Sequence, residues 1–157
     1  MNNDLKPQDY LPHEAPMVML ETVHQMTADH VICSVRVSDQ GVLAPFLDQQ
    51  GDLPAWFGLE IMAQTVGVSS GAQAASSPST DVQPAMGMLL GTQAYKTTTP
   101  SFKSGLLLTC EAKLLQRSGQ LSSFECSLKD GYHELASARV NTWQADAAPD
   151  TPDQQQG

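Results

Sequence analysis

Residues 53–74, LPAWFGLEIMAQTVGVSSGAQA, form a run in which nearly every side chain is apolar or small. Asp52 can cap a helix that begins near Pro54, because its carboxylate can accept a backbone N–H of the first turn. Pro54 suits that turn, because its missing N–H would have no acceptor within the helix. The two prolines in SSPSTDVQP end the helical pattern near Ala75. A helix that is apolar nearly all round has to be buried on most of its sides. The run therefore predicts a central helix from about Pro54 to about Ala75, covered by other elements.

The segments on both sides of this helix are typical of antiparallel strands. Residues 17–23, MVMLETV, carry apolar residues on both faces, and residues 30–37, HVICSVRV, alternate with period two. The turn formers in QMTADH join these two strands as a hairpin. Residues 38–53 predict a structured loop. Four further strands are predicted within residues 87–99, 105–119, 120–131 and 132–144, with turns at Ser118-Gly119 and Asp130-Gly131.

The order of two strands, one long helix and four strands limits the architecture. A lone helix between antiparallel strands is buried only if the sheet curls round it. Ala63, Gly67, Gly71 and Ala74 repeat at spacings of four and three, which gives the helix a smooth face that a sheet can approach closely. Two glycines inside a helix cost about 1 kcal/mol each relative to alanine, so close packing has to compensate. We expect an α+β fold with a curved antiparallel sheet of about six strands.

Composition and charge exclude several classes of function. The chain has 157 residues, of which 41% are hydrophobic and 16% charged, as in a globular protein. We expect one domain over residues 1–145 and a disordered tail rich in Asp and Gln over residues 146–157. The net charge of −9 argues against nucleic-acid binding. No apolar run reaches the ~18 residues of a membrane span, and the first residues lack signal-peptide features, so a cytoplasmic location is expected.

The cysteine pattern predicts neither a disulfide framework nor a zinc site. Cys33, Cys110 and Cys126 are odd in number, far apart in the chain and set among apolar or strand-forming neighbours. Free cysteines of this kind are usually buried. We expect three reduced thiols in the core, and neither a metal nor a cofactor.

Two motifs resemble the thioester dehydratases of the hotdog fold. Residues 11–23, LPHEAPMVMLETV, resemble the family segment L-P-H-R-x-P-hydrophobic-D-x-V, and residues 54–67, PAWFGLEIMAQTVG, resemble its helix P-G-V-hydrophobic-E-A-M-A-Q-x-x-G. Residues 44–64 are similar to the pattern N-P-F-L-D…P-A-W-x-G-hydrophobic-E-x-M-A-Q of 3-hydroxyacyl-ACP dehydratase-like proteins linked to aryl-polyene pathways. GMLLGT and NTWQ also match this subgroup. The resemblance covers residues 9–144.

The resemblance implies a hotdog fold in which a helix carboxylate works at a dimer interface with a facing histidine. Removing water from a 3-hydroxyacyl thioester needs a base for the C2 proton, an acid for the departing C3 hydroxyl, and donors for the thioester oxygen. Glu60 is the candidate acid, because desolvation beside an apolar channel favours a neutral carboxyl group. N–H groups near Trp56 and Phe57 are free of intrahelical acceptors and could polarise the carbonyl. Gln64, one turn later, could orient Glu60.

The histidine that serves as the base in the family is missing from the loop before the helix in this chain. Typical members carry G-H-F-P before the helix, whereas PFLDQQGDLP contains no histidine. His13 in LPHEAPM is the candidate base, with capping of the loop as its structural alternative. Asp48 is a second proton-transfer and substrate-binding candidate, with a turn as the alternative. His24, His30 and His133 lie beside turns and are expected to be solvated. Glu60 itself could instead only complement the helix dipole.

These residues lead to one principal function and two alternatives. The principal one is dehydration of a 3-hydroxyacyl thioester, carried on acyl carrier protein or CoA, by a homodimer or a heterodimer with a related dehydratase. The first alternative is a non-catalytic partner subunit that lends one wall of the pocket, and the second is thioester hydrolysis. An acidic carrier protein would need a local basic patch, for which Lys96, Lys103, Lys113 and Arg117 are candidates, unless they are scattered solvated side chains.

Overall fold

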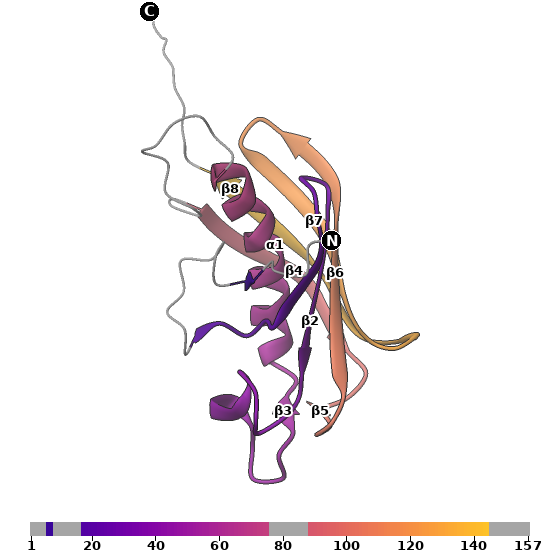
Figure 1. Ribbon diagram of the computed structural model, residues 1–157. Helices are drawn as coiled ribbons and strands as arrows, with labels where there is room; N and C mark the ends of the chain where they lie inside the picture. The colour runs from indigo at the N-terminus through magenta and orange to yellow at the C-terminus, as the bar shows by residue number, and fades with distance from the viewer. Residues whose placement is uncertain (1–5, 8–16, 76–87, 145–157) are drawn as a thin grey trace, which may run out of the picture.

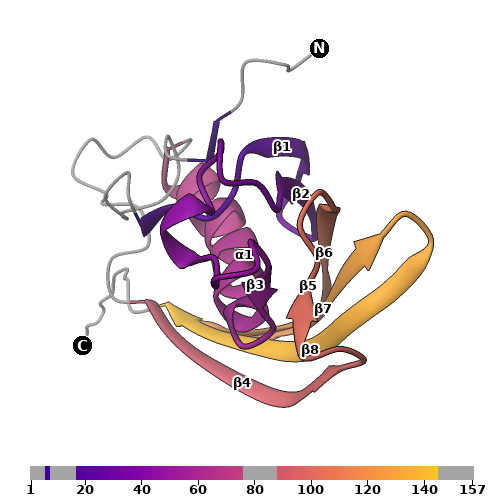
Figure 2. The same cartoon turned by 90° about the horizontal axis from the view of Figure 1, so that it is seen from below.

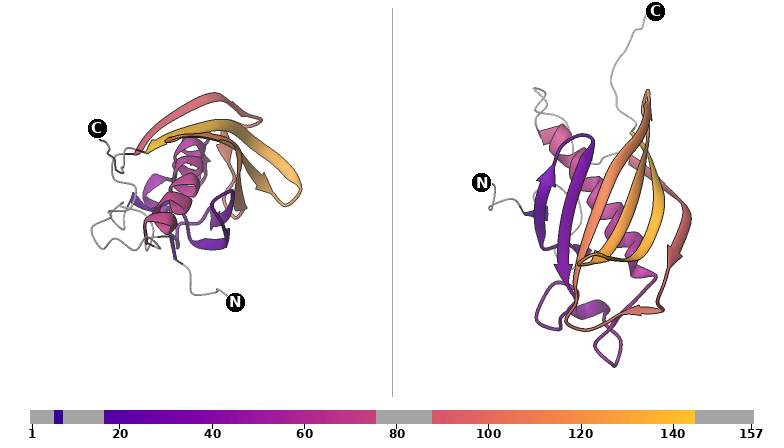
Figure 3. Two further views of the ribbon diagram at one scale, coloured as in Figure 1. Left: turned by 90° about the horizontal axis from the view of Figure 1, so that it is seen from above. Right: turned by 90° about the vertical axis from the view of Figure 1, so that its right-hand side faces the viewer.

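The computed structural model describes residues 6–7, 17–75 and 88–144. One long helix, α1 (Phe57–Ala75), lies in the concave face of a six-stranded antiparallel sheet (Figures 1 and 2). The two ends of this sheet lie on opposite sides of α1 (Figure 3). The expected curved sheet round one helix is confirmed. The tail predicted at residues 146–157 lies outside the described residues.

The strand order in the sheet is β1-β2-β6-β7-β8-β4. Gly119 and Gly131 have φ values of +61° and +62°, as the tight turns predicted at these positions require. A short 3-10 helix (η3, Ala44–Phe46) lies in the predicted loop. The strands are β1 (Thr22–Met26), β2 (His30–Arg36), β4 (Met88–Thr97), β6 (Leu107–Ser118), β7 (Leu121–Asp130) and β8 (His133–Gln144), and a separate pair is formed by β3 (Leu53–Pro54) and β5 (Ser101–Phe102).

The first strand begins later than the sequence predicts. Residues 17–21 are not in a strand, and pairing with β2 starts where the N–H of Glu21 donates to Ser34 O at 3.0 Å. Within this segment, residues 18–20 are all buried, so neither side of these three residues faces solvent. The N–H of Met19 donates to the side chain of Gln64 at 2.8 Å. The segment is therefore bound to α1 rather than to a neighbouring strand.

The start of the helix also differs from the prediction. The helix begins at Phe57, because Leu53 and Pro54 pair with β5. Asp52 does not cap α1. Its Oδ1 accepts the N–H of Ser104 at 2.8 Å, and its Oδ2 lies 3.4 Å from Lys103 Nζ. The long-range contact with residues 100–104 thus removes these residues from the helix.

The core lies between α1 and the concave face of the sheet. Alternate residues of β2 point inward, and Val31, Cys33 and Val35 are fully buried as predicted. Cys33, Cys110 and Cys126 are free and buried, which confirms the expected core thiols. Burial raises the pKa of Cys33 and of Cys110 to about 12 and also raises that of Cys126. Among the residues that the structure describes, no helix has both the length and the apolar character to cross a bilayer.

Candidate functional site

The first turns of α1 carry the residues to which the sequence assigns chemistry. Trp56, directly before the helix, is 68% exposed, and Glu60 in the first turn of the helix is also exposed. The apolar channel expected beside Glu60 stays a prediction, because this side chain is exposed in the single chain. It is exposed because α1 turns a different face, with Ile61, Thr65 and Val68, toward the sheet. The candidate acid therefore lies at an open surface of one chain.

Gln64 holds Glu60 in place, as the i, i+4 spacing predicts. Its Nε2 donates to Glu60 Oε2 at 2.9 Å and to the carbonyl of Met17 at 2.9 Å. Its Oε1 accepts the N–H of Met19 at 2.8 Å, and the side chain is almost fully buried. The link to Glu60 is visible in the sequence, but the two links to Met17 and Met19 are not. A buried amide thus joins the segment before β1 to the carboxylate.

Large apolar side chains are exposed beside this carboxylate. Trp56 lies one turn before Glu60, and Met17, whose carbonyl shares Gln64 Nε2 with Glu60, is 54% exposed. Exposed apolar side chains round a polar group are typical of a surface that another molecule covers. We call Met17, Trp56 and Glu60 the Glu60 face.

The peptide groups at the helix start offer hydrogen-bond donors. The carbonyl of Ala55 accepts the N–H of Gly58 at 2.9 Å and the hydroxyl of Tyr95 at 2.6 Å. Within residues 6–7, 17–75 and 88–144, no acceptor is found for the N–H groups of Trp56 and Phe57. The Phe57 ring packs on Phe46 of η3, with ring centroids 5.3 Å apart. These two N–H groups have the properties expected of donors to a substrate oxygen.

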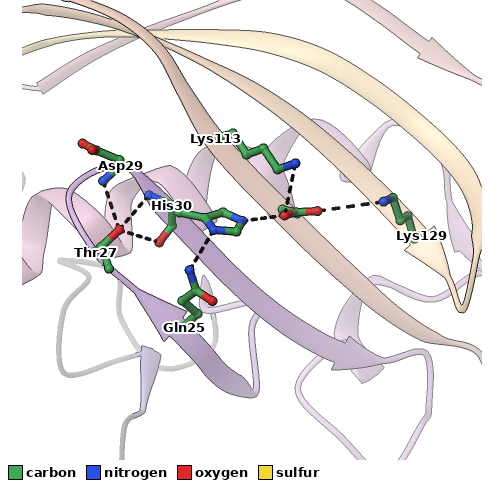
Figure 4. Close-up of polar contacts among 7 residues, drawn as sticks. Gln25, Thr27, Asp29, His30, Lys113 and Lys129 are labelled. Carbon is green, nitrogen blue, oxygen red and sulfur yellow. Dashed lines mark hydrogen bonds and ion pairs between the residues drawn. The ribbon is translucent and has the colours of Figure 1, made fainter.

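None of the hydrogen bonds made by the three described histidines involves the Glu60 face. His24 is exposed and its Nε2 lies 2.7 Å from Ser34 Oγ, and His133 is exposed at the start of β8. His30 was expected to be solvated but is half-buried, because its ring contacts Glu111 and Gln25 (Figure 4). His13, the candidate base, lies outside the described residues.

Glu111 is the centre of the network that contains His30. The carboxylate of Glu111 lies 3.7 Å from Lys113 Nζ and 3.9 Å from Lys129 Nζ. Partial burial alone would raise the pKa of Glu111, but the hydrogen bond with His30 and the charges of the two lysines outweigh it and lower that pKa. The network joins β2, β6 and β7 on the sheet.

Asp48 occupies a turn in the loop before the helix. Its Oδ1 accepts the N–H groups of Gln50 at 2.9 Å and Asp52 at 3.0 Å. Its own N–H donates to Asp52 O at 2.8 Å. These contacts form a turn, which is the structural alternative given for Asp48, and none of them joins Asp48 to Glu60.

The candidate basic residues are separate from one another. Lys103 pairs with Asp52, Lys113 with Glu111, and Arg117 Nη1 lies 3.9 Å from Asp29 Oδ1. These contacts favour the alternative of scattered side chains. Across the described ranges, no three or more His, Cys, Asp or Glu side chains gather as metal ligands would.

Two open surface hollows lie at other places on the molecule. One, of about 440 Å³, lies beside Arg36, Gln49 and Ser104. The other, of about 330 Å³, lies over β4 and β8 beside Lys96 and Arg139. The candidate catalytic and substrate-binding residues line neither hollow, and only the candidate basic residue Lys96 borders one of them.

Comparison with solved structures shows the fold. A chain of the dehydratase heterocomplex ApeI:P from Xenorhabdus doucetiae is 39% identical, with a TM-score of 0.81, over 90% of this chain and 92% of that chain. Cj0977, a sigma28-regulated virulence protein from Campylobacter jejuni, is 11% identical, with a TM-score of 0.62, over 87% and 82% of the two chains. The uncharacterized protein PH1136 from Pyrococcus horikoshii is 12% identical, with a TM-score of 0.61, over 87% and 96%. The architecture is the hotdog fold.

Comparison with families agrees with the sequence motifs. No curated protein matches the chain. The model of the ApeP-like family, described as ApeP dehydratase, matches residues 5–154, which include the Glu60 helix and all six strands of the sheet. This match and the 39% identity to the Xenorhabdus chain show that this protein belongs to the ApeP-like dehydratase family.

Proposed function

We propose that this chain takes part in the removal of water from a 3-hydroxyacyl thioester, at a site that Glu60 shares with a second subunit. The observation that carries the proposal is the Glu60 face: a carboxylate held by the buried Gln64 and flanked by the exposed side chains of Met17 and Trp56. Such a face has the chemistry for proton transfer but is open to water in one chain. A covering subunit would supply the missing wall.

The reaction assigns one role to each group. A base removes the C2 proton, the electron pair of that bond forms the C2–C3 double bond, and the C3 hydroxyl leaves as water with a proton from Glu60. Negative charge develops on the thioester oxygen as the C2 proton leaves, and the N–H groups of Trp56 and Phe57 donate hydrogen bonds to that oxygen. His13 is the proposed base. The product is a 2-enoyl thioester.

Two features support a second subunit as the covering partner. The edge strand β4 pairs with β8, and its other edge meets no strand among the described residues. In the dehydratase family, sheets pair edge to edge, as the motif resemblance implies. The similar chain from Xenorhabdus doucetiae comes from a dehydratase heterocomplex. We therefore propose a dimer, with a second copy or with a related dehydratase.

The finer assignments belong to the same proposal. Acyl carrier protein or CoA would carry the thioester, and the matches of APFLDQQGDLPAW and NTWQ to the subgroup pattern support a role in aryl-polyene synthesis. The proposed location is the cytoplasm.

A second candidate is a non-catalytic subunit that completes the pocket of a related dehydratase. It is favoured by the loop that precedes the helix, which has no histidine where the family usually has its base. In that loop, Asp48 is held in a turn by two backbone N–H groups. In this role the Glu60 face would still contact the partner and the substrate.

One assay separates these functions. A 3-hydroxyacyl thioester is given to the purified chain alone and with a related dehydratase that carries the loop histidine, and products are identified by mass spectrometry. Enoyl thioester from the chain alone supports dehydration, and enoyl thioester only from the mixture supports the shared site. Free acid would indicate hydrolysis, and no product from either would exclude the proposal.

A matched pair of variants tests the role of Glu60. Glu60→Gln removes the acid and should abolish the product that the chain or the mixture forms. Glu134→Gln makes the same change at an exposed position of β8 and should leave product formation unchanged. Equal activity of both variants would contradict the proposal.

A further inference from the structure

The edge strand β4 reaches the start of α1 through one side chain. The hydroxyl of Tyr95 donates to the carbonyl oxygen of Ala55 at 2.6 Å, across 40 residues of sequence. Burial raises the pKa of Tyr95 to about 12, so the hydroxyl keeps its proton at neutral pH.

The backbone of β4 is distorted where Tyr95 leaves it. The register with β8 shifts between Gln93 and Lys96, so an extra residue is inserted at this point of the strand. Ala94 has φ of +57° and is the one non-glycine residue with positive φ among those described. Bulges of this kind turn a side chain out of the regular alternation. Here the bulge directs Tyr95 to the helix start.

The helix leaves room for the tyrosine at Gly58. A Cβ atom at this position would overlap the Tyr95 hydroxyl oxygen and lie 3.1 Å from Leu128 Cδ1. The N–H of Gly58 donates to the same Ala55 carbonyl at 2.9 Å. The absence of a side chain at Gly58 thus allows both donors to reach one oxygen.

The two hydrogen bonds to the Ala55 carbonyl also fix the direction of the Trp56 N–H. This N–H belongs to the same planar peptide group as the Ala55 carbonyl, and no cis peptide bond occurs in the described residues. In a trans peptide the two groups point in opposite directions, so fixing the oxygen also fixes the direction of the N–H. Hydrogen bonds accepted by a carbonyl also polarise its amide and strengthen the N–H as a donor.

We propose that Tyr95 is a positioning residue, which fixes and polarises the Trp56 N–H that binds the thioester oxygen. The inference rests on the proposed function, in which that N–H receives the charge formed as the C2 proton leaves. Tyr95 acts through the Ala55–Trp56 peptide group and does not itself touch the substrate.

Tyr95→Phe tests this role in the full chain, in whichever assembly forms enoyl product. The charge on the oxygen is greatest in the transition state, so kcat should fall about tenfold while KM stays nearly constant. Tyr132→Phe makes the same change at an exposed tyrosine of the β7–β8 turn and should leave both constants unchanged. An unchanged kcat for a folded Tyr95→Phe variant would overturn the proposal and leave the proposed function intact.

A second measurement is independent of turnover. In NMR spectra of the 15N-labelled chain, the Trp56 amide proton should shift in Tyr95→Phe and stay in place in Tyr132→Phe, and an unmoved Trp56 signal would contradict the proposal. If Tyr95→Phe does not fold, Gly58→Ala replaces it, because the new Cβ atom on the helix pushes the Tyr95 hydroxyl away from the Ala55 carbonyl. This variant should lower kcat in the same way, and an unchanged kcat for Gly58→Ala would overturn the proposal. A wild-type chain inactive in every assembly would remove the proposed function and this role together.

Discussion

Gln64 Nε2 donates to Glu60 Oε2 at 2.9 Å, one helical turn away, and the same amide binds the backbone of the segment before β1. The position of the candidate acid therefore depends on residues 17–19, far from it in sequence. A side chain that joins two segments in this way couples stability to the geometry of the site.

Gln64→Leu should lower both stability and activity. The change leaves the buried N–H of Met19 and the carbonyl of Met17 without the Gln64 amide, and it frees Glu60 from its orienting contact. Loss of a buried partner costs about 2 kcal/mol per group left unsatisfied, so the midpoint of urea unfolding should fall clearly.

The matched control for this change is Gln116→Leu, at an exposed position of β6. Its unfolding midpoint should stay close to that of the wild type. Equal midpoints for the two variants would show that the Gln64 hydrogen bonds do not contribute to stability.

Gly58→Ala should destabilise the chain through Tyr95. The new Cβ overlaps the tyrosine hydroxyl, and such overpacking costs about 1 to 3 kcal/mol. In a Tyr95→Phe background the hydroxyl is absent, so the cost of Gly58→Ala should be smaller by about 1 kcal/mol. The four unfolding free energies of the double-mutant cycle measure this coupling, and strictly additive values would refute the steric explanation.

Glu111 should make stability depend on pH in the acid range. Its pKa is lower in the folded chain than in the unfolded chain, so its stabilising contribution is present above the unfolded value of about 4.3 and is lost as the pH falls through the folded value. In urea unfolding at a series of acid pH values, the free energy of unfolding should therefore fall more steeply with decreasing pH for the wild type than for Glu111→Gln.

Glu125→Gln is the control for the acid series, because Glu125 is exposed on the neighbouring strand β7. This variant should keep the wild-type pH dependence. A Glu111→Gln variant with the wild-type slope would mean that the His30 and lysine contacts do not persist in solution.

The three cysteines should not react in the native chain. Cys33, Cys110 and Cys126 are buried and their pKa values are raised, so neither access nor the thiolate form favours alkylation. Iodoacetamide at neutral pH should label none of them in the native state and all three in denaturant, as counted by mass spectrometry. Rapid labelling of the native chain would place a thiol at the surface.

Local sequence patterns correctly predicted the strands and turns whose conformation is set by residues close in the chain. The alternation of β2 and the turns at Gly119 and Gly131 are set within a few residues, and the structure confirms them. The predicted start of α1 was wrong, because Leu53 and Pro54 pair with β5, which lies far along the chain. No local signal records such a partner.

By itself, the sequence determined the family, the central helix and the Glu60–Gln64 pair, because motif spacing and an i, i+4 contact lie within one element. Only the tertiary structure decided that Glu60 is exposed in a single chain and that Tyr95 holds the helix start. These outcomes depend on which strands close the sheet and on where a bulge turns one side chain. Such long-range contacts form only when the whole sheet does.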